Sequence, residues 1–414
     1  MSKQYFKKGL PQLRFLEFKD GPEWSKKKLS DPKVAIFVKE KGKVSSLTLD
    51  TYISTENILP DYQGVVTASK LPPSGSFTLY KNNDVLISNI RPYLKKVWHA
   101  DKVGAASNDI LVIRAGSDVK SLYLLYLLKN DNFIDYMMSS AKGVKMPRGD
   151  IESIRNYPVF VPEREEQTKI AGCLSSLDDV ITTNNKKLDS LKLHKKGLLQ
   201  KLFTAEGKDI PELRFDGFEG EWEEVELRKL GDLISGLTYS PDDVRASGLL
   251  VLRSSNVQNG KIVYEDNVFV EPNIKGANIS EPDDILICVR NGSKALIGKN
   301  ALIPQNVPLS THGAFMTIFR SKYAQFTFQL FQTNAYQKQV DADLGATINS
   351  INGKQLLKYK FKIPRSNDEK EKIVKCLSSL DDLINAQTDK IEVLKEYKKG
   401  LMQQLFPKIK ESIA

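Results

Sequence analysis

The segment GSKALIGKN (292–300) is the nearest approach to a catalytic motif in this 414-residue chain. It resembles a phosphate-binding P-loop, in which glycine amides cradle phosphates and a Ser or Thr binds Mg²⁺. Its spacing is one residue too long, however, and Asn300 stands where the Ser or Thr is required. The sequence shows no GxGxxG after a strand, no NPP-type tetrapeptide for methyl transfer and no HExxH. We interpret His99, His194 and His312 as scattered surface or packing residues. The sequence therefore predicts no catalytic residues and no metal site, so that any reaction would need a separate catalytic partner.

The charge of the chain favours a polyanionic partner. Lys and Arg number 61 against 51 Asp and Glu, which gives a net charge of +10 and a pI of about 9.1. Such an excess is common in proteins that bind nucleic acid, although charge alone leaves the question open. Three cysteines, none in a CxxC pair, favour a reducing cytoplasm without structural zinc. No apolar run approaches the ~18 residues of a membrane span, so we expect no membrane association.

The chain contains an internal repeat. Residues 169–203 align without a gap on residues 372–406, and 20 of the 35 aligned positions are identical. The segment LPQLRFLEF (10–18) is echoed by IPELRFDGF (210–218), and Trp24 by Trp222. A period of about 200 residues is far longer than the roughly 20–50 residues of a solenoid unit. The sequence therefore predicts one unit copied in tandem.

Both copies of the long repeat predict a helix with a narrow apolar seam. The seam follows heptad spacing, which suits pairing with a helix of the same spacing. Its residues are Ile170, Leu174, Leu177, Ile181, Leu188, Leu191, Leu198 and Leu202 in the first copy, and Ile373, Leu377, Leu380, Ile384, Ile391, Leu394, Leu401 and Leu405 in the second. Asn184 and Lys195, and likewise Gln387 and Lys398, fill the gaps.

We expect the two helices to pair as an antiparallel coiled coil related by a pseudo-two-fold axis. Ile170 would then face Leu405, and Leu177 would face Lys398, which costs little if the lysine stem lies along the leucine and its ammonium reaches water. The alternative is that each helix packs on its own half as an ordinary core helix.

Between the helices, apolar β-branched runs alternate with helical patterns, so the fold class is α+β, with two α/β domains separated by two long helices. Strand candidates lie at 84–90, 109–115, 248–255, 284–290 and 314–320. Residues 121–138 and 323–340 look helical. We divide the chain into a first domain (1–162), a central helix (163–207), a second domain (208–364) and a C-terminal helix (365–414).

The duplicated LRF segment and tryptophan, the divergent halves and the helices ending in KKGLLQKLF and KKGLMQQLF resemble the specificity subunit of type I restriction-modification systems. The resemblance covers essentially the whole chain. It implies a non-catalytic subunit that reads a bipartite, asymmetric site in double-stranded DNA, one half-site per target-recognition domain. It also implies two modification (methyltransferase) subunits, which bring S-adenosylmethionine and dock on the helices, and restriction subunits, which bring ATP- and Mg-dependent translocation and cleavage.

DNA recognition needs polar and basic side chains that loops present to base edges and phosphates. In the first half the candidates are Ser54, Thr55, Asn57, Arg91, Lys95, Lys96, Lys145 and Arg148. In the second half they are Arg253, Ser255, Asn256, Arg290, Asn291, Lys294, Thr347, Asn349 and Asn352. Two other hypotheses stay open: a self-sufficient nuclease or methyltransferase with an unrecognised site, and a coiled-coil scaffold that binds only proteins.

Overall fold

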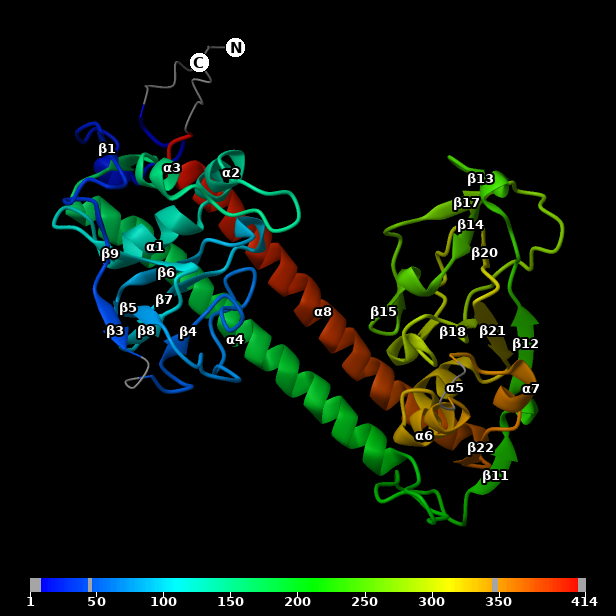
Figure 1. The fold of residues 1–414 in the computed structure, drawn as a ribbon. Coiled ribbons are helices and arrows are strands. Elements are labelled where there is room, and N and C mark those ends of the chain that lie inside the picture. The colour runs from blue at the N-terminus through cyan, green and yellow to red at the C-terminus, as the bar shows by residue number, and fades with distance from the viewer. Residues whose placement is uncertain (1–8, 44–46, 345–348, 409–414) are drawn as a thin grey trace. The chain divides into compact units, whose positions relative to one another are not determined.

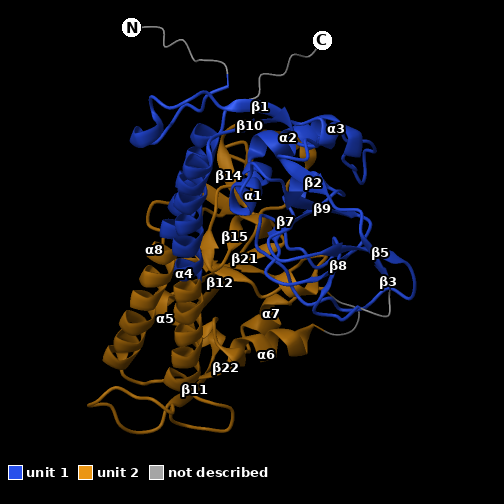
Figure 2. Ribbon diagram, turned by 90° about the vertical axis from the view of Figure 1, so that its left-hand side faces the viewer, with its two compact units in different colours: residues 1–185, 389–414 blue, residues 186–388 orange. Residues whose placement is uncertain are grey.

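The computed structural model describes residues 9–43, 47–344 and 349–408. The chain forms two compact units, of which unit 1 contains residues 1–185 and 389–414 and unit 2 contains residues 186–388 (Figure 2). Each unit therefore includes one end of each long helix together with its own sheets and short helices. In the part of the chain that is described, no helix is long and apolar enough to cross a membrane.

The long helices are α4 (Arg164–Leu202) and α8 (Asn367–Leu405), each 39 residues long (Figure 1). Each follows a short strand that stops at a proline; these strands are β10 (Pro158–Val161) and β22 (Lys360–Ile363). Acidic residues occupy the first turn of both helices, where negative charge favours the helix dipole.

The described part of unit 1 contains two four-stranded sheets, a strand pair and three short helices. The first sheet has the order β2 (Ala35–Phe37), β9 (Ile110–Ala115), β6 (Val85–Ser88), β7 (Val97–His99). The second has the order β3 (Lys41–Lys43), β5 (Ser76–Tyr80), β8 (Gly104–Ala106), β4 (Tyr52–Ile53). Strand β1 (Ser25–Lys28) pairs antiparallel with β10. The short helices are α1 (Ser121–Lys129), α2 (Asp131–Ser139) and α3 (Ile151–Arg155).

Unit 2 has a similar plan, with a different strand order in its second sheet and an additional strand pair. One sheet has the order β12 (Gly231–Ser235), β21 (Met316–Ser321), β18 (Ile285–Cys288), β19 (Asn300–Leu302). Another has the order β13 (Val244–Arg245), β17 (Val268–Val270), β14 (Leu249–Leu252), β20 (Ser310–His312). The strand pairs are β11 (Glu223–Glu226) with β22, and β15 (Val257–Gln258) with β16 (Lys261–Ile262). The short helices are α5 (Ala324–Leu330), α6 (Asn334–Asp343) and α7 (Gly353–Leu356).

Each segment that the sequence predicts as one short helix is in fact two helices. Residues 121–138 form α1 and α2, which meet at Asn130; its side chain accepts a hydrogen bond from the N–H of Asn132 and caps α2. Residues 323–340 form α5 and α6, and Thr333 caps α6 in the same way. A capping side chain begins a new helix because it satisfies N–H groups that the first turn leaves unpaired.

The long helices run antiparallel within each unit. In unit 1, Ile170 and Leu174 near the start of α4 share a hydrophobic core with Leu405 near the end of α8. In unit 2, Leu202 near the end of α4 shares a core with Ile373 near the start of α8. All sixteen seam residues are buried or half-buried. The antiparallel pairing expected from the seam is therefore confirmed.

The ends of the seam have a second role. The core of unit 1 that holds Ile170 and Leu405 also contains Trp24 and Tyr123 from the α/β part of the unit. The alternative prediction, packing of each helix on its own half, thus also describes these ends. At the ends of the seam, the same residues therefore contact both the other long helix and the α/β part of the unit.

An ion pair crosses the helix pair wherever a lysine interrupts the seam. Nζ of Lys398 lies 2.5 Å from Oδ1 of Asp178 in unit 1, and Nζ of Lys195 lies 2.6 Å from Oδ1 of Asp381 in unit 2. We call these two pairs the helix latches. The ammonium of Lys398 pairs with Asp178, the residue after Leu177, and the lysine side chain is 12% exposed.

Each latch is also bonded to a short helix of its own unit. Tyr126 of α1 donates its hydroxyl hydrogen to Asp178 over 2.7 Å. Gln329 of α5 donates from Nε2 to Asp381 over 3.0 Å. The latches therefore join the helix pair to the α/β part as well as helix to helix.

A buried glutamate in the first turn of each long helix binds the repeated arginine and tryptophan. Glu166 accepts hydrogen bonds from Nε and Nη2 of Arg14, both at 2.8 Å, and from Nε1 of Trp24 at 3.1 Å. The same arrangement recurs in unit 2, at 2.9, 2.9 and 3.1 Å, among Glu369, Arg214 and Trp222. The repeated LRF segment and tryptophan thus fix the start of each helix.

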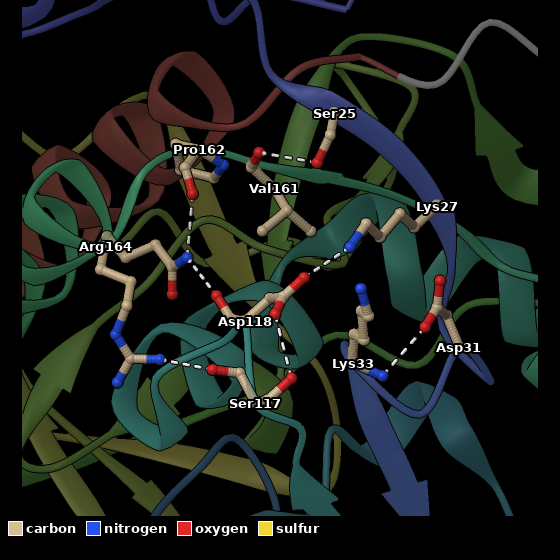
Figure 3. Close-up of polar contacts among 10 residues, drawn as sticks. Ser25, Lys27, Asp31, Lys33, Ser117, Asp118, Val161, Pro162 and Arg164 are labelled. Carbon is tan, nitrogen blue, oxygen red and sulfur yellow. Dashed lines mark hydrogen bonds and ion pairs between the residues drawn. The ribbon is translucent and has the colours of Figure 1, made fainter.

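Further hydrogen bonds attach the first turn of α4 to the turn after β9 (Figure 3). Nη1 of Arg164 donates to the carbonyl of Ser117 over 2.6 Å. Nε2 of Gln167 donates to the carbonyl of Asp118, and the carboxylate of Asp118 lies 2.7 Å from Nζ of Lys27 in β1. The start of α4 is consequently bonded to the turn after β9, and that turn is itself paired with β1.

Candidate nucleic-acid interface

The candidate residues lie in three loops that recur in both units. The first loop follows β4 or β14 and comprises residues 54–57 in unit 1 and 253–256 in unit 2. The second follows β6 or β18 and comprises residues 89–96 and 289–294. The third precedes α3 or α7 and comprises residues 145–149 and 349–352. The candidate Thr347 lies outside the described residues.

In unit 1 the three loops contact one another. Nζ of Lys96 in the second loop donates to the carbonyl of Thr55 in the first over 2.5 Å. The N–H of Arg91 in the second loop donates to the carbonyl of Pro147 in the third over 2.8 Å. Residues that are far apart in the sequence are thereby brought together.

Unit 2 joins its loops in a similar way. Nδ2 of Asn291 in the second loop donates to Oγ of Ser254 in the first over 3.1 Å. The N–H of Asn291 donates to the carbonyl of Asn349 in the third loop over 3.4 Å, and Nδ2 of Asn349 donates back to Gly292 over 3.3 Å. The two units therefore present the same three-loop arrangement.

Backbone pairing shows which residues of the two second loops are equivalent. Ile90 forms an isolated β-bridge with Arg148 in unit 1, and Arg290 forms one with Ser350 in unit 2. Ile90 and Arg290 therefore occupy equivalent positions in the two units, and the residues that follow them are equivalent as well. We call the backbone arrangement of the three loops in each unit the three-loop frame. This frame is repeated in both units, while the side chains that it presents differ.

Asn57 and Asn256 are structural residues of the first loop. They are 4% and 0% exposed, and each side-chain carbonyl accepts the N–H of the residue three positions earlier, Ser54 or Arg253. Nδ2 of Asn57 donates to Tyr52 and Val66, and that of Asn256 to Val263. Their hydrogen-bonding groups are already used within the loop, so we no longer assign a DNA contact to either; their shared spacing is the signal for this structural role.

The remaining candidates differ in their surroundings. Ser54, Thr55, Arg91, Lys95, Lys96, Arg253, Asn291 and Asn349 are half-buried, whereas Lys145, Arg148, Ser255, Arg290, Lys294 and Asn352 are exposed. Some are already engaged: Lys95 pairs with Asp131 over 2.6 Å, and the Asn352 side chain caps α7. Burial, followed by the nearby charge of Arg91, lowers the pKa of Lys96.

Two buried aspartates that the sequence did not single out position the strand before the second loop. Asp84 accepts hydrogen bonds from Nε and Nη2 of Arg114, both over 2.8 Å, at the start of β6. Asp284 makes the same two bonds with Arg320 at the start of β18, also over 2.8 Å. The available signal was the position of each aspartate directly before a strand of similar sequence, VLIS (85–88) or ILIC (285–288).

Comparison with known proteins agrees with this duplicated architecture. A model of the type I restriction modification DNA specificity domain matches the chain twice, over residues 16–193 and 219–396. The chain is 26% identical over 390 residues to the specificity subunit of the type I restriction enzyme MjaVIII of Methanocaldococcus jannaschii, covering 88% of both chains. It is 27% identical over 195 residues to the specificity subunit of the type I restriction enzyme EcoKI of Escherichia coli, covering 44% of this chain and 41% of that one.

Solved structures show the same fold. The S subunit of a type I restriction-modification system from M. genitalium matches with a TM-score of 0.60 at 16% identity, covering 97% of this chain and 100% of that chain. A chain of a type I R-M system, solved for its complex assembly and conformational transition, matches with a TM-score of 0.57 at 18% identity, covering 93% and 98%. Since the family model spans most of both halves, the chain belongs to the type I restriction modification DNA specificity family.

Proposed function

We propose that this chain is the DNA specificity subunit of a type I restriction-modification complex and that each unit reads one half of a bipartite, asymmetric site. The observation that carries the proposal is the recurrence of one three-loop frame with different side chains. An identical reaction at both sites would need identical side chains. Reading two different half-sites needs a common frame and different side chains.

DNA contacts would come first from the exposed candidates, Lys145 in unit 1 and Ser255, Arg290 and Lys294 in unit 2. Arg148 is exposed too, but its guanidinium is already paired with Asp109, so we do not assign it a DNA contact. Lysine and arginine suit phosphates, and arginine and serine also suit base edges. We keep the division into two recognition domains, 1–162 and 208–364, and two helical segments as the functional organisation.

In this function the chain carries out no reaction itself. Modification subunits would transfer the methyl group of S-adenosylmethionine, and restriction subunits would use ATP and Mg²⁺ for translocation and cleavage. This chain would determine which DNA sequence the complex acts on. We place the complex in the cytoplasm, where its DNA target lies.

The outer edge of the paired helices suits the docking of modification subunits. Val180 and Tyr397 in unit 1, and Leu193 and Leu383 in unit 2, are exposed apolar side chains that lie outside the seam. Val180, Tyr397 and Leu383 each directly precede a seam position, which places them along the flank of the helix pair. Exposed apolar groups on such a surface are typical of protein contacts. These two groups of exposed residues, one in each unit, would provide docking sites for two modification subunits.

The proposal is tested by assembling the chain with its modification subunits. We expect methylation of a single bipartite sequence, mapped in cells and in the purified complex, only when this chain is present. DNA affinity should fall steeply with salt, because each neutralised phosphate adds about 0.9 to the log–log slope.

Three outcomes would contradict the proposal. Methyl transfer or cleavage by the purified chain alone would support a self-sufficient enzyme. Complexes that form but do not bind DNA would support a scaffold that contacts only proteins. A DNA affinity that does not change with salt would rule out the phosphate contacts.

A further inference from the structure

The four arginines of the three-loop frames differ in whether a carboxylate neutralises them. Nη2 of Arg148 lies 2.6 Å from Oδ1 of Asp109, and Nη2 of Arg253 lies 2.8 Å from Oδ2 of Asp266. Arg91 and Arg290 have no carboxylate partner among the residues that the structure describes. Both belong to the second loop, Arg91 in unit 1 and Arg290 in unit 2. Each unit thus holds one arginine there whose charge its own unit does not neutralise.

Arg91 is held in place at an energetic cost. Its backbone is left-handed, with φ 50° and ψ 61°, a conformation that non-glycine residues seldom adopt. Its Nε is buried without a hydrogen-bond acceptor in the described part of the protein. It also lies close enough to Lys96 to disfavour the charge of that lysine. A half-buried guanidinium that lies beside a second cation and has no carboxylate partner in the described chain favours an acceptor from outside the chain.

Arg290 is oriented by an aromatic ring. Its Cζ lies 5.7 Å from the ring centroid of Phe315, and both side chains are exposed. Its backbone N–H donates to the carbonyl of Phe315 over 3.1 Å, which keeps the two residues together. Stacking on a ring fixes the plane of a guanidinium while its N–H donors at the edge stay available.

A planar guanidinium with free donors and a fixed orientation matches the paired acceptors O6 and N7 of guanine. A phosphate would also accept these donors, but it places little demand on orientation, and the exposed Lys145 and Lys294 can serve it. We propose that Arg91 and Arg290 each read a guanine, one in each half-site. This inference rests on the proposed function and names the base that the second loop selects.

The test compares methylation maps and DNA affinities of assembled complexes that carry Arg91→Gln or Arg91→Lys. Arg148→Gln is the matched control, because Arg148 lies in the same frame and is already paired with Asp109. We expect Arg91→Gln to weaken discrimination at one guanine position of one half-site by about 5- to 150-fold, the range of one good bidentate contact. Arg91→Lys should retain most of the salt dependence but lose the same discrimination. Arg290→Gln should act on the other half-site alone.

Several results would overturn the inference while leaving the proposed function intact. Wild-type complexes could methylate a half-site that contains no guanine. Arg91→Gln could lower affinity equally for all sequences and reduce the salt slope by about 0.9, with Arg91→Lys restoring both, which indicates a phosphate contact. Unchanged maps for both glutamine variants would also refute it. Variants whose unfolding midpoints equal that of the wild type show that a loss of discrimination does not come from a loss of folding. A wild-type complex that methylates DNA without sequence preference would refute the proposed function instead.

Discussion

At the scale of single residues, the buried Glu166 has the largest predicted effect on stability. Its side chain is 2% exposed and binds both Arg14, which is 9% exposed, and Trp24. Replacing Glu166 with Ala leaves a buried guanidinium unpaired, which typically costs about 3–5 kcal/mol. We expect unit 1 to unfold at a clearly lower denaturant concentration, as followed by circular dichroism.

Lys169 provides the control for this prediction. It lies one turn after Glu166 in α4 and pairs with Glu17 of the segment before β1, and the two side chains are 53% and 47% exposed. Exposed pairs contribute about 0–1 kcal/mol, so Lys169→Ala should change stability little. Equal losses in the two variants would show that the buried pair has no special role.

Lys129 makes the stability of unit 1 depend on pH. Burial lowers its pKa from 10.5 to about 8, and the charge of Lys398 acts in the same direction while that of Asp178 opposes it. Between about pH 8 and 10.5 the unfolded chain therefore binds more protons than the folded one, so stability rises with pH in this window.

Replacing Lys129 with Met should remove that rise and stabilise the protein at neutral pH. The measurement is the free energy of unfolding from pH 7 to 9, where the tyrosines of the unfolded chain, with an ordinary pKa of about 10, are still mostly protonated. Lys26→Met, at an exposed lysine of the same unit, is the control and should keep the rise. A pH profile that is identical in wild type and Lys129→Met would refute the prediction.

The sequence predicted the loops of the candidate site better than it predicted the residues. Polar types after a strand indicate a binding loop, and all three loops of each unit do meet. Residue type could not separate Asn57, which holds its own loop together, from Arg91, whose Nε has no acceptor in the described chain. That difference depends on partners that only the folded backbone brings near.

At the scale of elements, the latches should contribute to helix pairing. Asp178 and Lys398 come from different helices, and their side chains are 36% and 12% exposed. A double-mutant cycle with Asp178→Ala, Lys398→Ala and both together should give a coupling energy of about 1 kcal/mol. The corresponding cycle on Lys195 and Asp381 should behave alike, because its geometry is equivalent.

A charge in the seam tests the helix pair more severely. Leu177 is half-buried beside the latch, and Leu177→Asp would bury a carboxylate there that has no partner of its own. We expect a lower melting temperature and loss of modification-subunit binding. Wild-type melting and assembly in this variant would count against the antiparallel pair as the docking surface.

Element prediction succeeded where the pattern was long and failed where one side chain decided the outcome. Thirty-five residues of heptad spacing identified each long helix, and alternating β-branched runs identified β6 and β18. The break between α1 and α2 depends on Asn130 alone, whose carbonyl oxygen caps the second helix. Asparagine inside a helical pattern carries no such information until its neighbours are placed.

For the whole molecule, we predict that the two half-sites can be changed independently. Each three-loop frame is built entirely from residues of its own unit. Replacing residues 222–364 with the corresponding segment of a relative should therefore change one half-site and leave the other unaltered. A methylation map of the hybrid complex is the measurement, and a simultaneous change in both half-sites would refute the two-reader organisation.

The sequence was informative about the whole molecule because the chain repeats itself. Two matched helices indicated a duplication, and the helices pair within both units as their seams require. The sequence could not show that the two divergent halves keep one frame, because the frame is held by backbone contacts such as the bridges of Ile90 and Arg290. Backbone contacts place few demands on residue type, so they persist while the sequence diverges.

The paired latches have a consequence for inheritance. The aspartate and lysine of each latch belong to the repeated segments 169–203 and 372–406, which supply both groups in both copies. A genetic exchange with its endpoints inside these segments would replace a whole reader and preserve every latch. Among the polar contacts, the incoming piece needs an arginine and a tryptophan that can reach Glu369 and a donor that can reach Asp381, as Arg214, Trp222 and Gln329 do. The helices are thus natural crossover points, at which a lineage can acquire a new target sequence in one step without rebuilding its assembly.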